Sequence, residues 1–259
     1  MSGPTPRTRS EELLLARISA AAGRARLGRR LTTHAARAYR SRTRAGLHRA
    51  VRRLSARVRI RIRARARALP TETASNARLD LYEHGMTVAV GARIRVVRYD
   101  TTSVFRPSAP PRCSAPAGTG LVHTLTDIEG KCLVLQGGLG GGALLSWEYE
   151  LRRAVTRAQL PRALAALHRG ERVSFGDLWT TADHMGSGTL RTPWHQVQDF
   201  GVRQGVLTVT TGGRERGLGT RVSKVPNLFV FRALAEHLRT EHLRTEHLRA
   251  EHFCAEDGC

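Results

Sequence analysis

A glycine-rich stretch comes nearest, in residue types and spacing, to a recognised chemistry. Residues 136–145 read QGGLGGGALL, and Gly138, Gly140 and Ala143 satisfy the G-x-G-x-x-A spacing of a dinucleotide site, after a strand-like segment. A Rossmann fold also needs a further buried strand that ends in an acid about 20 residues past the glycines. The sequence there predicts a helix instead. A nucleotide-dependent enzyme that uses the loop 137–142 is therefore only an alternative, and we expect no enzyme.

Four polar residues in the second half of the chain are of the types that serve as acid–base catalysts or metal ligands. These are Asp183, His184, His195 and Asp199. No ligand spacing recurs among them, so ordinary solvent-exposed side chains are the better interpretation. The four cysteines form no C-x-x-C pair, which favours free thiols over a zinc motif. We expect no catalytic residue, no metal site and no cofactor.

The C-terminal tail contains a five-residue repeat, EHLRTEHLRTEHLRAEHF, which begins at Glu236. Five residues turn an α-helix by about 500°, so successive histidines drift around the helix by about 140° and never share a face. This spacing excludes the histidine pair of a helical zinc motif, and it excludes a coiled coil as well. Each glutamate meets the arginine three residues later, which predicts a solvated, salt-bridged helix without a function of its own.

Arginine dominates the charge of the chain and is unevenly spread. The formal net charge is +22; residues 1–70 hold 20 Arg and two Glu, whereas residues 71–259 hold 23 basic and 19 acidic residues. The densest run is VRIRIRARARAL at 58–69. A GC-rich coding sequence contributes to this excess, because only two of the 43 basic residues are lysine. The predicted contacts with a membrane or another polyanion are Arg49, Arg52, Arg53, Arg57, Arg59, Arg61, Arg63, Arg65 and Arg67.

Three interpretations fit this arginine-rich segment. Leu47, Val51, Leu54 and Val58 form an apolar stripe beside arginines, an arrangement typical of an interfacial helix on anionic lipid. The basic charge of residues 40–67 equally favours nucleic acid or another polyanion, although residues 1–70 offer a single aromatic residue, Tyr39, for base stacking. A solvated tail without a partner is the third interpretation.

The elements that position these residues are predicted from periodicity. A helix is expected to begin at Ser10, with Leu14 and Ile18 on its apolar face. A second, basic helix is expected over residues 40–69, followed by a linker at 68–77.

Beyond the linker, strand patterns replace helical ones. Residues 86–99 predict a hairpin that turns at Gly91, and TTSVFR after it predicts a further strand. A proline-rich loop and a second hairpin around Ile128-Glu129-Gly130 follow. A helix is then predicted for residues 144–168, interrupted at Pro161.

The same order returns in the second half of the chain. Residues 172–211 predict several short strands, and a final helix follows with Pro226 in its first turn. The repeated order predicts an α+β fold of two small, bent antiparallel sheets or partial barrels. Each sheet is followed by a C-terminal helix, and a basic helical segment precedes both.

Four strings in this part of the chain carry a resemblance to a known family. LDLYEHGMTVAV, RVVRYDTTSVF, AVTRAQLPRALAALHRGERVSFGDLW and VPNLFVFRALAEHL resemble an uncharacterised bacterial family of unknown function, over about residues 78–238. The resemblance implies tandem pleckstrin-homology-like domains, each a small bent antiparallel sheet closed at one end by a helix. It implies no reaction, because the family brings no accepted catalytic residues. Some relatives carry a membrane-spanning stretch of a kind not found here.

The expected domains are an arginine-rich helical or disordered segment at 1–70, pleckstrin-homology-like domains at 78–169 and 171–238, and a helical extension at 239–259. Neither a signal peptide nor a transmembrane helix is predicted, so we expect a cytoplasmic protein, peripheral to the inner membrane where its arginines bind lipid. The expected function is that of a non-enzymatic interaction or scaffold protein with an unknown protein partner.

Overall fold

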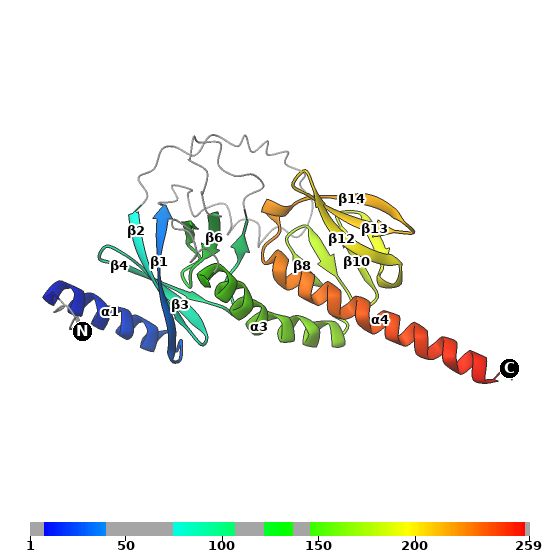
Figure 1. The fold of residues 1–259 in the computed structure, drawn as a ribbon, viewed down its shortest axis with the longest axis horizontal. Helices are drawn as coiled ribbons and strands as arrows, with labels where there is room; N and C mark the ends of the chain where they lie inside the picture. Colours follow the sequence, from blue (N-terminus) through cyan, green and yellow to red (C-terminus); the bar gives the residue numbers. More distant parts are fainter. Residues whose placement is uncertain (1–7, 40–74, 107–121, 137–145, 257–259) are drawn as a thin grey trace, which may run out of the picture. The chain divides into compact units, whose positions relative to one another are not determined.

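The computed structural model describes residues 8–39, 75–106, 122–136 and 146–256 (Figure 1). Contacts divide the chain into two compact units, the first made of residues 1–102 and 111–149 and the second of residues 103–110 and 150–259. The described part contains three α-helices and three sheets with antiparallel pairing. The predicted α+β class is therefore confirmed.

Helix α1 (Arg9–Arg24) begins almost where the sequence predicts, but Thr8 caps it in place of Ser10. The Thr8 hydroxyl accepts a hydrogen bond from the Glu11 amide at 3.3 Å, and the Glu11 carboxylate accepts one from the Thr8 amide at 3.0 Å. This reciprocal capping box satisfies two amides that the first helical turn leaves free. The chain leaves the helix through Arg26, whose φ of 53° ends the helical conformation.

Strand β1 (Arg30–Tyr39) is the largest difference from the expected fold, because residues 1–70 were predicted to be helical or disordered. It pairs with β2 (Ser75–Tyr82) on one side and with β7 (Cys132–Gln136) on the other. Hydrogen bonds to both neighbours stabilise a strand whose own apolar alternation is weak. The segment 40–74 therefore joins two neighbouring strands of the first unit, and β2 already begins within the predicted linker.

The remaining strands of the first unit form the two predicted hairpins. β3 (Gly85–Val90) and β4 (Arg93–Arg98) are joined by a turn with Gly91 at a φ of 54°, and β6 (Val122–Thr126) pairs with β7. The strands of this unit run in the order β4-β3-β2-β1-β7-β6. A longer strand was predicted at TTSVFR, but β5 (Val104–Phe105) has two residues.

The sheet of the first unit bends back on itself without closing into a barrel. The Ile128 amide, in the β6–β7 turn, donates a hydrogen bond of 3.0 Å to the Val96 carbonyl of β4, at the far edge of the sheet. Buried apolar side chains alternate along the strands and line one face: Leu79, Leu81, Met86, Val88, Val97, Leu125, Leu133 and Leu135.

Helix α1 lies along β3 and β4 on the other face of the sheet (Figure 1). Ala21 and Ala22 of the helix, together with Leu27 just after it, pack against Tyr82 and Val96. The N-terminal helix is thus part of the first unit's folded core.

A buried carboxylate also stabilises this outer face. Asp80 of β2 is fully buried; Arg78 donates two hydrogen bonds to it at 2.8 and 2.9 Å, and the Thr33 hydroxyl donates a third at 2.7 Å. Burial alone would raise the Asp80 pKa. The hydrogen bonds from Arg78 and Thr33, with the positive charges of Arg78 and Arg30, outweigh burial and hold the pKa below its usual value.

The second unit contains two smaller sheets. One has the order β11-β10-β9-β8 and the other the order β12-β13-β14. The strands are β8 (Val173–Phe175), β9 (Leu178–Thr180), β10 (His184–Ser187), β11 (Leu190–Pro193), β12 (Val197–Arg203), β13 (Val206–Thr211) and β14 (Arg214–Arg221). The Ser187 and Thr220 hydroxyls are hydrogen-bonded and join the two sheets. In the core of the second unit, the Phe231 ring packs edge-to-face with the rings of Phe175 and Phe200.

Two helices follow the strands in chain order. α3 (Ser146–His168) continues through Pro161, where an interruption was predicted. The proline costs one backbone hydrogen bond, but the helix goes on because Leu167, beyond the proline, is buried in the core. α4 (Leu228–Glu256) begins after Pro226, which was expected inside the first turn, and continues through the repeat. Its Glu236–Arg239 ion pair, 3.4 Å long, is of the predicted kind.

The order of elements repeats as expected. A run of four strands, a run of three strands and a helix occur once as β1–β4, β5–β7 and α3, and again as β8–β11, β12–β14 and α4. The three tryptophans, at 147, 179 and 194, are buried and belong to the core. The domain limits expected at 78–169 and 171–238 stay predictions, with β1 lying ahead of the first.

Candidate functional site

Several connections of the first unit meet at one end of its sheet. The strand register places the end of β1, the start of β2, the β3–β4 turn and the β6–β7 turn at this same end. Tyr39 and Ser75 flank the segment 40–74, so the arginine-rich connection leaves and re-enters the sheet there. We call this end of the first unit the basic end.

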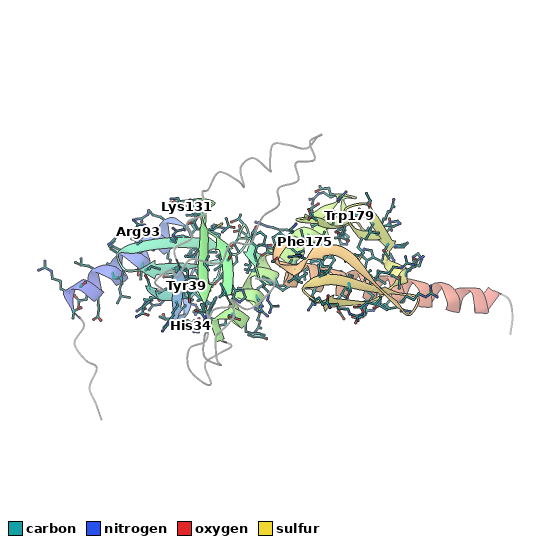
Figure 2. The ribbon with its side chains drawn as sticks, turned by 90° about the horizontal axis from the view of Figure 1, so that it is seen from above. His34, Tyr39, Arg93, Lys131, Phe175 and Trp179 are labelled. Carbon is teal, nitrogen blue, oxygen red and sulfur yellow. The ribbon has the colours of Figure 1, made fainter. Side chains whose placement is uncertain are left out.

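A groove of about 610 Å³ lies at the basic end, between α1, β4 and the β6–β7 turn. Alanine and isoleucine side chains form much of its wall, and seven charged residues line it. The basic residues are Arg17, Arg24, Arg93, Arg95 and Lys131, and the acidic residues are Asp127 and Glu129. Figure 2 shows Arg93 and Lys131 along the same margin of the first unit.

Two of the basic residues hold the turn in place. Arg95 forms an ion pair of 3.3 Å with the buried Asp127 carboxylate and donates to the Cys132 carbonyl at the same distance. The same carboxylate accepts the amides of Glu129 and Lys131 at 3.0 and 2.7 Å. Lys131 pairs with the Glu129 side chain, and that hydrogen bond, with the lysine charge, lowers the Glu129 pKa. These charges are neutralised within the turn.

Three arginines of the groove have no carboxylate partner in the part of the chain that the structure describes. Arg17 donates a hydrogen bond of 2.9 Å to a carbonyl of the β3–β4 turn, and Arg24 and Arg93 form no ion pair among the described residues. Guanidinium groups bind phosphate and carboxylate oxygens through paired N–H donors. The groove can therefore hold an anionic group.

The nine arginines predicted as polyanion or membrane contacts, Arg49 to Arg67, lie outside the described residues. The structure places the two ends of their segment at the basic end. It adds Arg17, Arg24 and Arg93, which were absent from the predicted contacts. These three come from α1 and β4, and no run or spacing in the sequence links them.

The other sites considered from the sequence receive no support. The glycine loop 137–142 lies outside the described residues. Asp183, His184, His195 and Asp199 are spread over the start of β10, a short helical turn and β12. No group of three or more potential metal ligands occurs in the part of the chain that the structure describes.

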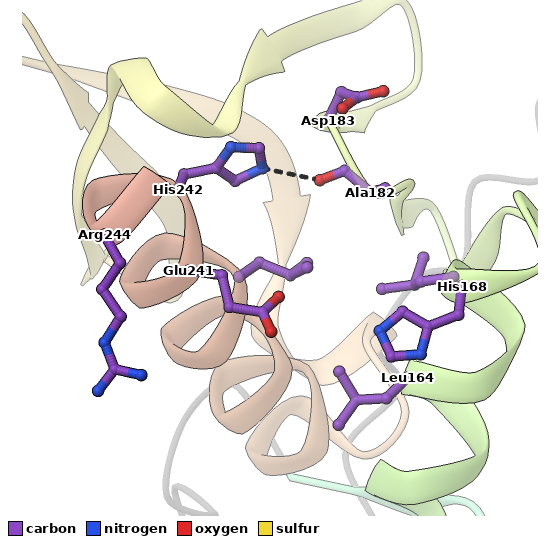
Figure 3. Close-up of a pocket in the computed structure, with 9 residues that line it drawn as sticks. Leu164, His168, Ala182, Asp183, Glu241, His242 and Arg244 are labelled. Atoms are coloured by element: carbon purple, nitrogen blue, oxygen red, sulfur yellow. Dashed lines mark hydrogen bonds between the residues drawn. The ribbon is translucent and has the colours of Figure 1, made fainter. Parts of the chain in front are cut away.

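A second cavity, of about 460 Å³, lies in the second unit between α3, the β9–β10 connection and α4. His168 and Glu241 point into the space between the helices, and Arg244 points away from it (Figure 3). The His242 ring contacts the Ala182 carbonyl at 3.0 Å, and Glu241 forms an ion pair of 3.1 Å with His237. His242 and Glu241 thus have partners within the protein.

A buried pair in the first unit also has the residue types of acid–base chemistry. His123 and Glu148 are 3.2 Å apart, and the edge of Trp147 lies against the imidazole, with ring centroids 5.8 Å apart. Both are buried, and neither lines either cavity. The pair joins β6 to the first turn of α3.

The fold and the groove define an α+β protein with a basic, open surface on its first unit. The model of a family described as "Family of unknown function (DUF6585)" matches residues 148–243, from the first turn of α3 into α4. The match agrees with the expectation of an uncharacterised family and brings no activity or ligand. No match is found among curated proteins. None of the described helices is long and apolar enough to cross a membrane.

Proposed function

We propose that the protein is a non-enzymatic interaction protein that attaches to an anionic membrane surface through its basic end. The observation that carries the proposal is the position of the connection 40–74. It holds 12 arginines and one glutamate, and its two ends join the sheet beside the groove in which Arg17, Arg24 and Arg93 have no carboxylate partner among the described residues. The two ends of the arginine-rich connection and the basic groove thus belong to the same end of the unit.

The repeated order of four strands, three strands and a helix supports a tandem pleckstrin-homology-like fold. In this proposal the first domain begins at β1, and the connection 40–74 is a long insertion in it. A bacterial, cytoplasmic protein at the inner membrane surface belongs to the same proposal. A fold of this kind confers no headgroup specificity, so the ligand chemistry is argued from the arginines alone.

The magnitude of the attraction is sufficient for peripheral binding. Each arginine or lysine near an anionic bilayer contributes about 1 kcal/mol, within a screening distance of about 10 Å at moderate salt. Half of the connection's arginines would contribute about 6 kcal/mol, which corresponds to a dissociation constant of roughly tens of micromolar. The paired domains would then present their other surfaces to a protein partner.

The test must keep the whole chain, because a fragment that starts at residue 71 lacks α1 and the central strand β1. We would replace the nine predicted arginines with glutamine in the full chain. Co-sedimentation would compare vesicles of phosphatidylcholine and phosphatidylglycerol with vesicles of phosphatidylcholine alone. The full chain should pellet only with the anionic vesicles, and less as salt rises. The nine-fold variant should stay in solution.

A matched pair of variants separates the basic end from total charge. Arg17, Arg24 and Arg93 changed together to glutamine should weaken binding. Arg214, Arg216 and Arg221 on β14, exposed and without ion pairs among the described residues, are the control for an equal loss of charge. If both triple variants weaken binding equally, or if the full chain never pellets, the proposal is wrong. Binding to DNA without binding to vesicles would make nucleic acid the partner.

A further inference from the structure

We infer that Leu13 and Ile128 enter the bilayer beside the arginines of the basic end. The inference rests on the proposed function, and it identifies the anionic partner as a lipid surface with an apolar interior. It uses described residues only.

Ile128 is an apolar side chain that the backbone holds out at the tip of the β6–β7 turn. Its side chain is half exposed, at 52%. Its amide is bonded to the Val96 carbonyl, and the amides of Glu129 and Lys131 are bonded to the Asp127 carboxylate. These bonds fix the backbone of the turn, so moving Ile128 into the core would require the turn to break them.

Leu13 lies at the same end through the direction of α1. The Arg17 guanidinium bonds to the Ala92 carbonyl in the β3–β4 turn, while Arg98 bonds to the Ala25 carbonyl at the other end of the helix. The helix therefore runs alongside β4 in the same direction, and its first residues pass beyond the turn. Leu13 lies one helical turn before Arg17 on the same face, about 6 Å further out. It is 59% exposed.

The neighbours of these two residues distinguish them from other exposed apolar side chains. Leu31 lies near the opposite end of β1, and Leu190 and Val202 belong to the second unit. Tyr149, also exposed, lies in α3. Among these exposed residues of the described chain, Ile128 lines the groove and Leu13 lies one helical turn before Arg17, which lines it too, whereas the other four do not. Basic and apolar groups together are what a membrane interface binds, whereas nucleic acid attracts such a surface through its phosphates.

Substitutions without a change of charge test the inference in the full chain. Ile128→Asn and Leu13→Gln should each weaken binding to phosphatidylcholine–phosphatidylglycerol vesicles about fivefold, since each removes part of a buried aliphatic side chain. Leu190→Gln and Val202→Asn, at similarly exposed sites of the second unit, should leave it unchanged. Binding to a DNA duplex should be the same for all four variants and the wild type.

A spectroscopic readout places the residue in the bilayer directly. Ile128→Trp should gain fluorescence that is blue-shifted by anionic vesicles and quenched by brominated lipid, beyond the signal of the wild type. Suppose that the wild type binds the vesicles, the Ile128 and Leu13 variants bind them equally well, and the indole of Ile128→Trp is not quenched. The inference is then wrong, and the proposed function stands. Failure of the wild type to pellet would instead refute the proposed function.

Discussion

Truncation of Leu27 to alanine tests whether the N-terminal helix belongs to the folded first unit. Leu27 follows α1, is fully buried, and packs among Ala21, Ala22, Tyr82 and Val96. If α1 were a basic segment detached from the sheet, the change would hardly alter the free energy of unfolding. If α1 covers the sheet, the free energy of unfolding should fall.

The expected cost is large because the site cannot collapse. An added Cβ at Gly85 would lie 2.7 Å from Cδ2 of Leu27, so strand β3 already packs tightly against this side chain. Leucine-to-alanine changes in such cores cost roughly 3 kcal/mol, the sum of lost transfer energy and a residual cavity. That is a substantial part of a typical domain stability of about 5 to 15 kcal/mol.

Urea denaturation followed by circular dichroism measures the loss, and hydrogen exchange read by mass spectrometry assigns it to the first unit. Leu13→Ala, at an exposed position of the same helix, is the control and should change the free energy of unfolding by less than about 0.5 kcal/mol. If Leu27→Ala and Leu13→Ala have equally small effects, α1 does not cover the sheet and the reasoning fails.

Three further substitutions have clear expected outcomes. Asp80→Asn should destabilise the first unit by about 2 kcal/mol, because Arg78 loses its buried partner. Since the folded Asp80 pKa is lowered, its contribution is present above about pH 4 and is lost as pH falls through the folded pKa; unfolding titrations should therefore show a smaller loss of stability in acid for the variant. Asn227 has a φ of 50°, and its side-chain oxygen accepts a hydrogen bond of 2.8 Å from the Val104 amide. Asn227→Ala removes this hydrogen bond and leaves an alanine in the left-handed region, so thermal denaturation should reveal a loss of stability of about 2 kcal/mol. Gly186→Ala would place a Cβ 2.1 Å from the Leu190 carbonyl oxygen, so the soluble yield and the near-ultraviolet dichroism of the second unit should fall.

The sequence predicts those elements whose own residues show the periodicity of a helix or strand, or the glycine that a turn needs. The hairpin at Gly91 has alternating apolar residues in each strand and a glycine where the turn needs positive φ. Met86 and Val88 of β3 lie on the core face, whereas Ile94 and Val96 of β4 lie on the opposite face, toward α1. The final helix continues through the repeat because its glutamates and arginines suit an exposed helix. Local periodicity was sufficient in both places.

Strand β1 cannot be predicted from local periodicity, and the reason is physical. The residues that face inward, at positions 32, 34, 36 and 38, are Thr, His, Ala and Ala, and the outward face is largely exposed. Neither face shows an apolar stripe, so period two is invisible in hydropathy. The strand is specified by β2 and β7, both of which are remote along the chain, and such pairing is not readable from one segment.

The groove is unpredictable for a similar reason. Arg17 and Arg93 are single arginines among many, and only the packing of α1 on β4 and the bent sheet bring them together. The densest charge, at residues 58–67, is evident in the sequence, but the connection of its segment at both ends to neighbouring strands, β1 and β2, is not.

Attachment at both ends changes what the arginine-rich segment can do. Neighbouring strands lie about 5 Å apart, so both ends of the connection 40–74 are held close together at the basic end. Closing a chain of 35 residues instead of a four-residue turn costs only about 2 kcal/mol, because loop-closure entropy grows with the logarithm of length. The fold therefore tolerates such an insertion between β1 and β2. In the proposed function, an insertion tied at both ends would raise the effective concentration of its 12 arginines near the groove, compared with a free tail of equal charge. Such an insertion would add a binding surface to a small sheet without a change in its core.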